Sequence, residues 1–382
     1  MTSSRADYAH VRWLVHDLSR NPKVELQVIA LGPHLSPLFG HTGESIAHAR
    51  GKSRVASFAI EQIECLLDSD TDVGMAKTIG VATLGVADTL ARLRPDLLVL
   101  IADRYEMLAP AAAALALRIP MAHIEGGEIT VGAIDDAVRN ALTKMSHLHF
   151  ACTRKAVERI EAMDEEPWRV TFSGSLSLDT LRRERLLTKL QLENRLGWPL
   201  TRRAVIGIYH PVTMMQDTLN EADEVFDAFQ AISGQLIFVF PNADAGSREL
   251  IRKAEKCVAD RRDSRILVNL DHRTYLSLLK HAGALVGNSS SGIIESTPLG
   301  VPAVNVGIRQ LGREHAANVI DTPANRAAIL AAVRRALSIP FRRSIRNLTS
   351  AYGEGRAASI VAKTLVRAPL GPKLLFKHTE LL

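Results

Sequence analysis

Four carboxylates lie within one short stretch of the chain. Residues 123–140 read HIEGGEITVGAIDDAVRN and include Glu125, Glu128, Asp135 and Asp136. Carboxylates can transfer protons, and they stabilise the oxocarbenium-like species through which chemistry at the anomeric carbon of a sugar passes. A plainer interpretation is that Asp135 and Asp136 only begin a helix and that Glu128 is solvated. The pattern therefore indicates either sugar chemistry or an ordinary helix start.

Polar residues also follow other apolar runs. Asp103 and Arg104 come after LLVLIA, His210 after VIGIY, Asn242 after IFVFP, and the loop 288–291 after ALVG. Ligands of doubly wound sheets bind beyond the carboxyl ends of the strands. Any one of these residues could simply form a turn. Together with Glu125 they predict a shared polar site.

Short apolar runs alternate with longer helical patterns along the whole chain. The runs are ELQVIAL, PDLLVLIA, IPMAHIE, HLHFACT and RVTFSGS, then AVIGIYH, QLIFVFP, RILVNL, GALVGNS and VPAVNVG. This alternation is typical of parallel strands joined by right-handed crossovers. It predicts an α/β protein with two doubly wound, Rossmann-like domains and an active site in the cleft between them.

The predicted domain junction is the charged segment 175–203, which contains Pro199. We place the first domain at 1–175 and the second at 176–352, and expect a C-terminal helix at about 353–382 to pack back on the first domain.

Composition excludes several classes of protein. The 382 residues are 47% hydrophobic and 23% charged, which suits two globular domains, and no apolar run is long enough to span a membrane. The amino-terminal MTSSRADYAH has no signal-peptide pattern, which favours the cytoplasm. Three cysteines without paired spacing argue against a disulfide framework or a metal site. The net charge of +6 is diffuse and aromatic residues make up 5%, so we expect an anionic small substrate and no nucleic acid.

The stretch GNSSSGIIESTPLGVP, residues 287–302, has the pattern of a strand end, a small-residue loop and a helix start. Its amides and hydroxyls suit a phosphate, and Glu295 suits ribose hydroxyls. The alternative is a serine-rich helix cap without a ligand. The stretch matches neither a dinucleotide fingerprint nor a Walker loop, so we expect no organic cofactor. The arginine turn SRADY is a second place for a diphosphate.

From about Ser4 to Tyr352 the chain resembles the UDP-N-acetylglucosamine 2-epimerase family. The motifs that carry the resemblance are SRADY, HLSPLFG, SDTDVGMAKTIG, ADRYEML, HIEGGEITVGAIDDAVRNALTKMSHLHF, YHPVT, PNADAG and GNSSSGIIESTPLGVPAVNVGIRQLGRE. HIEGG, AIDD, YHPVT and GNSSSGIIE resemble its hydrolysing branch, which opens sialic and legionaminic acid synthesis. The resemblance implies a glycosyltransferase-B architecture, with the nucleotide held mainly by the second domain.

The resemblance also implies the reaction. UDP leaves by anti elimination to give an acetamidoglucal, and water then adds to give free N-acetylmannosamine or a relative. The implied catalytic residues are Asp103, Glu125, Asp135, His210 and the adjacent Asp136. The implied substrate-binding residues are Arg5, Arg104, Arg139, Asn242, Asn288, Ser289, Ser290, Ser291, Gly292, Glu295 and Arg309. Which carboxylate is the base stays open, because crowded acids titrate together.

Several alternatives remain. A non-hydrolysing epimerase, a glycosyltransferase of the same architecture and a silent nucleotide-sugar sensor are the competing functions. The substrate is UDP-N-acetylglucosamine, a UDP-linked diacetamido-trideoxy sugar or a GDP-linked sugar. The family also implies a homodimer or homotetramer, and the stretch AAAALALRI either packs at an interface or against its own sheet.

Two departures from the family pattern concern strand ends. Ala102 stands where the family often has glycine before DR, and we expect no loss of activity from it. Only MTSS precedes Arg5, where the family has a buried first strand. One hypothesis is that the natural chain begins upstream; the alternative is that residues 1–4 form a shortened strand.

Overall fold

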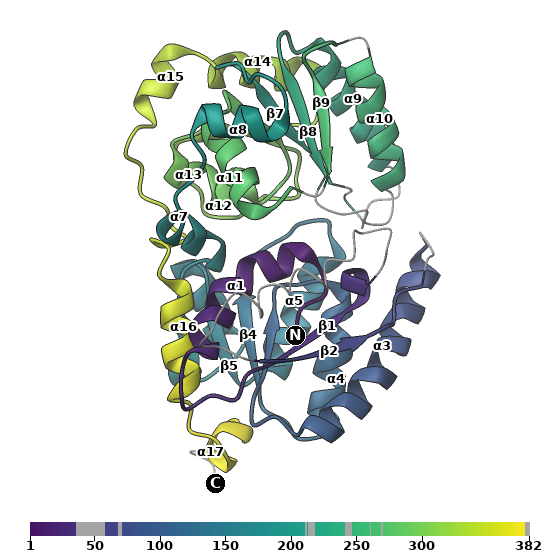
Figure 1. The fold of residues 1–382 in the computed structure, drawn as a ribbon, viewed down its shortest axis with the longest axis vertical. Helices are drawn as coiled ribbons and strands as arrows, with labels where there is room; N and C mark the ends of the chain where they lie inside the picture. Colours follow the sequence, from purple (N-terminus) through teal and green to yellow (C-terminus); the bar gives the residue numbers. More distant parts are fainter. Residues whose placement is uncertain are drawn as a thin grey trace. The chain divides into compact units, whose positions relative to one another are not determined.

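The computed structural model describes residues 1–35, 58–67, 71–210, 212, 218–240, 247–259, 261–268 and 270–378. The chain divides into two compact units (Figure 1). Unit 1 comprises residues 1–128, 134–179 and 352–382, and unit 2 comprises residues 129–133 and 180–351. Unit 1 therefore includes the C-terminal residues from 352 onward, and residues 129–133 group with unit 2.

Within its described residues, unit 1 contains two parallel sheets, one of four strands in the order β3-β4-β5-β6 and one that pairs β1 with β2. Their bounds are β1 (Gln27–Leu31), β2 (Ala59–Ile63), β3 (Leu98–Ile101), β4 (Met121–Gly126), β5 (Leu148–Ala151) and β6 (Val170–Phe172). Every residue of β5 is buried, as expected for a parallel strand covered by helices on both faces.

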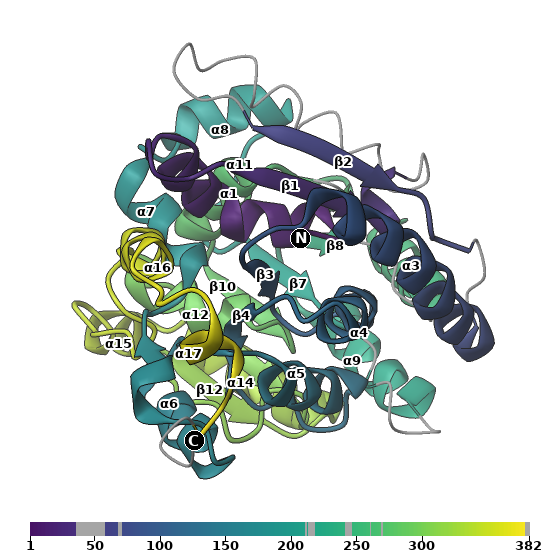
Figure 2. The ribbon, with the colours of Figure 1, turned by 90° about the horizontal axis from the view of Figure 1, so that it is seen from below.

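Helices cover both faces of the four-stranded sheet (Figure 2). On one face lie α3 (Asp72–Leu93), α4 (Leu108–Ala116) and α5 (Ile134–Met145). On the other lie α1 (Arg5–Ser19) and α16 (Ala357–Val366). The remaining helical pieces of unit 1 are α6 (Arg154–Ala162), α7 (Asp179–Arg183, which begins at its boundary), α17 (Pro372–Leu375), η1 (Gly32–Leu35), η3 (Tyr105–Met107), η4 (Pro167–Arg169) and η5 (Leu176–Leu178).

The first residues of the chain lie between the two sheets of unit 1. Thr2 forms a parallel bridge with Ala30 of β1, and the amino group of Met1 donates to Val99 O of β3 at 3.0 Å. Ser4 then caps α1 through a hydrogen bond from the Asp7 backbone amide. Residues 1–4 therefore contact both sheets through one isolated bridge and one hydrogen bond, and they form no strand of their own.

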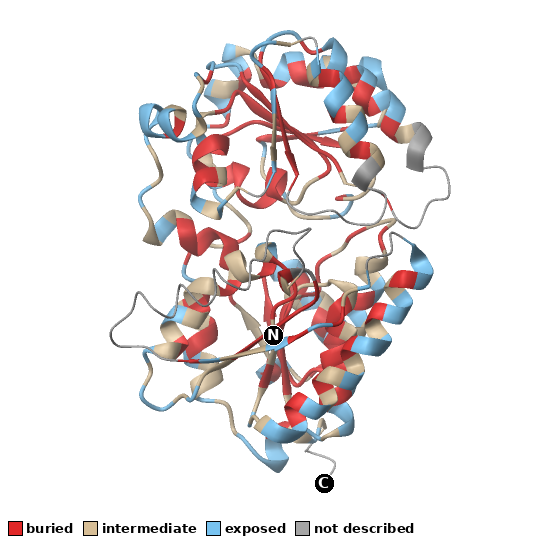
Figure 3. Cartoon of the chain, turned by 45° about the vertical axis from the view of Figure 1, so that its right-hand side comes forward, coloured by how far each residue is buried: buried red, intermediate tan, exposed pale blue. Residues whose placement is uncertain are grey.

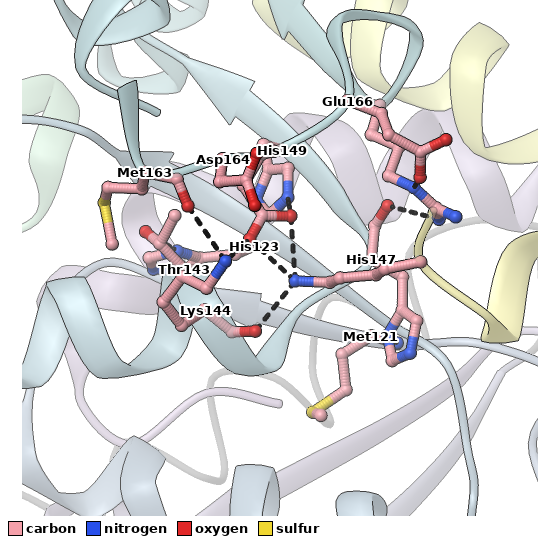
Figure 4. A network of polar contacts seen from close by, with 12 residues as sticks. Met121, His123, Thr143, Lys144, His147, His149, Met163, Asp164 and Glu166 are labelled. Atoms are coloured by element: carbon pink, nitrogen blue, oxygen red, sulfur yellow. Dashed lines mark hydrogen bonds and ion pairs between the residues drawn. The ribbon is translucent and has the colours of Figure 1, made fainter. Parts of the chain in front are cut away.

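The C-terminal segment packs on unit 1 through a buried polar network (Figure 4). Glu165 accepts from His149 Nε2 at 3.0 Å and from Lys377 Nζ at 2.8 Å, and Lys144 Nζ lies 2.8 Å from the same carboxylate. Arg169 donates to the carbonyl of Leu374 at 2.8 Å. Burial raises the pKa of Glu165, but the hydrogen bonds from His149 and the two lysines outweigh it and hold the pKa at about 2.

The described part of unit 2 forms one parallel sheet of six strands in the order β12-β11-β10-β7-β8-β9. The bounds are β7 (Val205–Ile208), β8 (Leu236–Phe240), β9 (Arg265–Val268), β10 (Ala284–Gly287), β11 (Ala303–Val306) and β12 (Val319–Thr322). The helices are α8 (Lys189–Leu196), α9 (Thr218–Ala231), α10 (Ser247–Ala259), α11 (His272–His281), α12 (Ser291–Ile294), α13 (Ser296–Leu299), α14 (Arg326–Ala336) and α15 (Ile339–Ser344).

The core of unit 2 has two halves, one on each face of its sheet (Figure 3). Along β8, Leu236, Phe238 and Phe240 face the side covered by α9, α10 and α14, whereas Ile237 and Val239 face α8 and α11. This alternation follows from the period of two in a strand. The prediction of two doubly wound units is therefore confirmed.

The sequence analysis missed two strands and left the packing of one helix open. β2 and β12 lie at sheet edges and include polar residues, so they lack the apolar runs of the inner strands. In α4, Ala111, Ala113 and Ala114 are buried in the core of unit 1, and Leu115 is 55% exposed. The stretch AAAALALRI mainly packs within its own unit. Among the described helices none is long and apolar enough to cross a membrane.

Candidate active site

Glu125 lies at an irregular end of β4. The register with β5 shifts between Ile124 and Gly126, and Glu125 has φ of +70°, a conformation that is uncommon for a residue with a side chain. Such bulges redirect a side chain out of the strand alternation and are frequent beside active sites. Ser175 Oγ donates to Glu125 Oε1 at 3.3 Å, and His10 Nδ1 lies 3.8 Å from the same oxygen.

Asp103 follows β3 and pairs with a buried arginine. The Arg139 guanidinium donates to Asp103 Oδ2 and to the backbone oxygen of Glu128, the second bond at 3.0 Å, and it lies 3.5 Å from Asp136 Oδ1. Arg139 therefore connects the end of β3, the segment after β4 and the first turn of α5. Asp135 lies in that same turn, so the expected helix start is present along with the cluster of acids.

Glu128 is buried, which makes the interpretation of a solvated side chain wrong. Thr153 Oγ1 donates to Glu128 Oε1 at 3.1 Å, and the Tyr352 hydroxyl donates to Oε2 at 3.3 Å. Because these partners come from distant parts of the chain, the local sequence held no signal for them. Glu128 thus ties three segments of unit 1 together.

His123 supports the end of β3, a role that the sequence reading missed. Its Nε2 donates to Ala102 O at 2.8 Å, so Nδ1 accepts from the Thr143 hydroxyl at 3.1 Å. Burial lowers the pKa of His123 to about 4, which keeps the ring neutral at pH 7. The HIEGG motif contains this histidine, but the sequence did not indicate that its side chain points into the core. That direction follows from the pleat of β4.

Ala102 occupies a left-handed backbone conformation with φ of +59°. A residue with a Cβ is strained there, whereas glycine is not, although glycine also gains entropy in the unfolded chain. We expect Ala102→Gly to raise the free energy of unfolding by about 0.5 kcal/mol and to leave kcat within about 2-fold. Urea unfolding and steady-state assays measure both effects.

Ala331→Gly is the matched control, because Ala331 is exposed inside the regular helix α14. Glycine should cost about 1 kcal/mol there. If Ala102→Gly and Ala331→Gly lost the same free energy of unfolding, the claim of backbone strain at Ala102 would be wrong.

Two arginines of the expected diphosphate set also lie in unit 1. Arg5 is the first residue of α1. Arg104 donates to Glu106 Oε1 at 3.0 Å and to Oε2 at 3.3 Å. Burial raises the pKa of Glu106, against the opposing effect of Arg104. Glu106 was not singled out from the sequence, and it holds the guanidinium of Arg104 in place.

In unit 2, Asn288 fixes the backbone of His210. The His210 amide donates to Asn288 Oδ1 at 2.7 Å, and Asn288 Nδ2 donates to His210 O at 2.8 Å. Arg309 Nη1 and Gln310 Nε2 donate to the backbone oxygen of Asn288 at 3.2 and 2.9 Å. The Asn288 side chain therefore bonds both backbone groups of His210, and its contact with substrate stays a prediction.

The loop after β10 leads into two short helices where one was expected. α12 ends at Ile294 and α13 begins at Ser296, so Glu295 lies at the break. Ser289 and Ser290 are partly exposed, whereas the Ser291 hydroxyl bonds the Tyr275 hydroxyl. Gly292 packs closely, because a Cβ there would lie 3.2 Å from Leu285 Cδ2.

Glu295 is 4% exposed, and within the described chain its carboxylate has no hydrogen bond or ion pair. Asn242 lies outside the described residues. Of the expected residues, Asp103 and Asp136 share Arg139, which we call the carboxylate cluster of unit 1, and Asn288 and Arg309 contact each other after β10 in unit 2.

Comparison with known proteins decides the family. The sequence profile described as UDP-N-acetylglucosamine 2-epimerase matches residues 16–366. The chain belongs to this family. It is 35% identical over 331 residues to a GDP/UDP-N,N'-diacetylbacillosamine 2-epimerase (hydrolyzing) of Campylobacter jejuni, which covers 85% of this chain and 84% of that protein. It is 33% identical over 379 residues to a UDP-N,N'-diacetylbacillosamine 2-epimerase (hydrolyzing) of Legionella pneumophila, covering 99% and 97%.

The fold of this 2-epimerase family member also matches solved structures. A crystal structure of a Neisseria meningitidis UDP-GlcNAc 2-epimerase bound to UDP-GlcNAc has a TM-score of 0.77, with 14% identity, and covers 96% of this chain and 98% of that one. At that identity the likeness supports the fold alone. The predicted family and the predicted class of enzyme, a hydrolysing 2-epimerase, are confirmed by the sequence comparisons.

Proposed function

We propose that this 2-epimerase hydrolyses a UDP-linked 2-acetamido sugar, and that UDP-N,N'-diacetylbacillosamine is its preferred substrate. The two relatives at 33% and 35% identity carry diacetylbacillosamine in their names, whereas a UDP-N-acetylglucosamine 2-epimerase of Neisseria meningitidis is 29% identical over 341 residues. The products are UDP and the free sugar with inverted configuration at carbon 2.

The proposal divides the substrate between two sets of residues. The nucleotide takes its contacts from unit 2, with Ser289, Ser290 and Arg309 at the diphosphate and Glu295 at the ribose. The sugar takes its contacts from the carboxylates of unit 1. Cations and backbone amides neutralise the charge that develops on the departing diphosphate.

The reaction proceeds in two balanced steps. A base removes the proton on carbon 2, the electron pair forms the carbon 1–carbon 2 double bond, and the carbon 1–oxygen bond to UDP breaks. Water then adds to carbon 1 while a proton returns to carbon 2 on the opposite face. No redox equivalent is consumed in either step.

The partners of the acids favour different roles for them. Asp103 is paired with the Arg139 guanidinium. It suits stabilisation of positive charge at carbon 1. Glu125 accepts a hydrogen bond from the Ser175 hydroxyl and lies beside His10. We assign proton transfer to Glu125 and leave Asp135 and Asp136 as further acids near the sugar.

The convergence on Arg139 is the observation that carries the proposal. It gathers carboxylates from the end of β3 and the first turn of α5, beside the Glu125 bulge of β4. A glycosyltransferase has no need of several acids around one ring.

Proton NMR in deuterated water tests the function. The protein is incubated separately with UDP-N-acetylglucosamine and with UDP-N,N'-diacetylbacillosamine. We expect free UDP and a carbon-2-deuterated, inverted free sugar, formed faster from the second substrate. An inverted sugar that stays linked to UDP would identify a non-hydrolysing epimerase, and the absence of turnover would identify a sensor.

The ribose contact gives a separate prediction. Removing the charged partner of ribose hydroxyls should cost about 1.5–3 kcal/mol of binding free energy, so Glu295→Ala should weaken UDP binding about 10- to 100-fold. Isothermal titration calorimetry measures the dissociation constant. Glu255→Ala, an acidic change on the exposed side of α10 in unit 2, serves as the control. Equal affinity in Glu295→Ala and the parent would remove the ribose assignment.

The homodimer or homotetramer and the cytoplasmic location stay predictions. The family resemblance is the support for the oligomer.

A further inference from the structure

The chain makes a five-residue excursion between β4 and α5. Residues 129–133 group with unit 2, while Glu128 before them and Ile134 after them belong to unit 1. Asp135 and Asp136, in the first turn of α5, follow directly. The excursion is therefore the covalent link between unit 2 and the acids of α5.

Arg313 holds this excursion by two hydrogen bonds. Its Nε donates to Ile129 O at 2.7 Å, and its Nη2 donates to the Thr130 hydroxyl at 2.9 Å. Thr130 is buried. The planar guanidinium presents both donors in one rigid fork, which fixes the direction of the backbone as well as its distance.

Close glycine contacts fix the excursion further. Gly132 has φ of +75°, and a Cβ there would lie 2.7 Å from Val212 Cγ1. Gly312 has φ of +84°, and a Cβ there would lie 3.5 Å from Ile129 Cδ1. The excursion therefore packs tightly against Val212, and Ile129 lies within ordinary van der Waals distance of Gly312.

The segment that carries Arg313 also contacts the loop after β10. Arg309 and Gln310 donate to the backbone oxygen of Asn288, which immediately precedes Ser289 and Ser290. Gln310 is buried, so its bond is shielded from water. Residues 309–313 thus contact the candidate diphosphate loop at one end and the excursion at the other.

We propose that Arg313 is a positioning residue that couples the diphosphate loop to the acids of α5. This inference rests on the proposed function. A bound diphosphate orders the loop after β10. This order is transmitted through residues 309–313 to the excursion, and so to Asp135 and Asp136. Arg313 acts through these segments and does not contact the substrate. A displacement of catalytic groups by about 1 Å costs on the order of 100-fold in rate.

The test separates turnover from nucleotide affinity. Arg313→Gln removes the fork, Arg313→Lys keeps the charge, and Arg265→Gln is the matched control, because Arg265 Nη1 donates to two backbone carbonyls elsewhere in unit 2, each at 2.7 Å. We expect kcat of Arg313→Gln to fall about 10- to 100-fold, with the UDP dissociation constant changed less than about 3-fold. Arg313→Lys should recover part of kcat, and Arg265→Gln should match the parent.

Three results would overturn the inference. One is a kcat for Arg313→Gln within about 2-fold of the parent, and another is a loss of UDP affinity in proportion to kcat, which would make Arg313 a nucleotide ligand. The third result applies if Arg313→Gln does not fold. Thr130→Val then removes one of the two groups that accept from Arg313, and a kcat of Thr130→Val equal to that of the parent would overturn the inference. The parent enzyme separates the two hypotheses: no turnover of either UDP-sugar refutes the proposed function, whereas an active parent with equally active Arg313 variants refutes only this inference.

Discussion

Glu125→Gln is expected to lower kcat at least ~100-fold while the UDP dissociation constant changes less than about 3-fold. The amide keeps the shape of the side chain and can still accept from the Ser175 hydroxyl, but it cannot take a proton from carbon 2. UDP binding depends on the loop residues of unit 2 and should not sense this change. Stopped assays of UDP release and calorimetry with UDP measure the two quantities.

Asp103→Asn should give a loss of the same order for a different reason. The amide removes the negative charge that stabilises the developing cation and leaves the Arg139 guanidinium without its carboxylate. Glu61→Gln is the matched control, since Glu61 is a carboxylate of unit 1 paired with Arg92 on β2 and α3. Of these variants, only Glu61→Gln should behave like the parent. Near-normal turnover in both Glu125→Gln and Asp103→Asn would refute their catalytic assignment.

Exchange of the carbon-2 hydrogen with deuterated solvent distinguishes the roles of the two carboxylates further. If Glu125 moves the proton, Glu125→Gln should abolish exchange at carbon 2 together with UDP release. Asp103→Asn should slow both in the same ratio, because it acts on the charge at carbon 1. Exchange retained in Glu125→Gln would transfer the role of base to another acid of the cluster.

Arg139→Gln is expected to have the largest effect on stability. Removing one partner of a buried ion pair costs about 3 kcal/mol, at the lower end of the usual range because the Asp103 side chain is 22% exposed. The backbone oxygen of Glu128 also loses its donor. Arg139→Lys should recover little, because a single ammonium cannot reproduce the fork that reaches Asp103 and Glu128 O together.

The urea midpoint of the transition of unit 1, followed by circular dichroism, measures this effect. Arg92→Gln provides the control, since the Arg92–Glu61 pair is exposed and should contribute less than about 1 kcal/mol. An Arg139→Gln midpoint as high as that of Arg92→Gln would show that Arg139 is not a structural centre of the carboxylate cluster.

The amino-acid sequence by itself determined the architecture and the identity of the acids. Runs such as LLVLIA and LIFVFP mark buried parallel strands because both of their faces must be apolar, and this signal is local. The polar residues that follow those runs, among them Asp103 and Glu125, could be named for the same reason. The edge strands β2 and β12 escaped, because a strand exposed along one side tolerates polar residues.

Only the tertiary structure decided which partner each of these residues takes. Arg139 meets Asp103, Glu128 meets Thr153 and Tyr352, and Asn288 meets the backbone of His210. The packing of strands and helices brings these partners together from distant parts of the chain. A local sequence pattern cannot predict such contacts. The same reason hid the excursion at 129–133, because its stretch of sequence continues from β4 toward α5 while its hydrogen bonds come from Arg313.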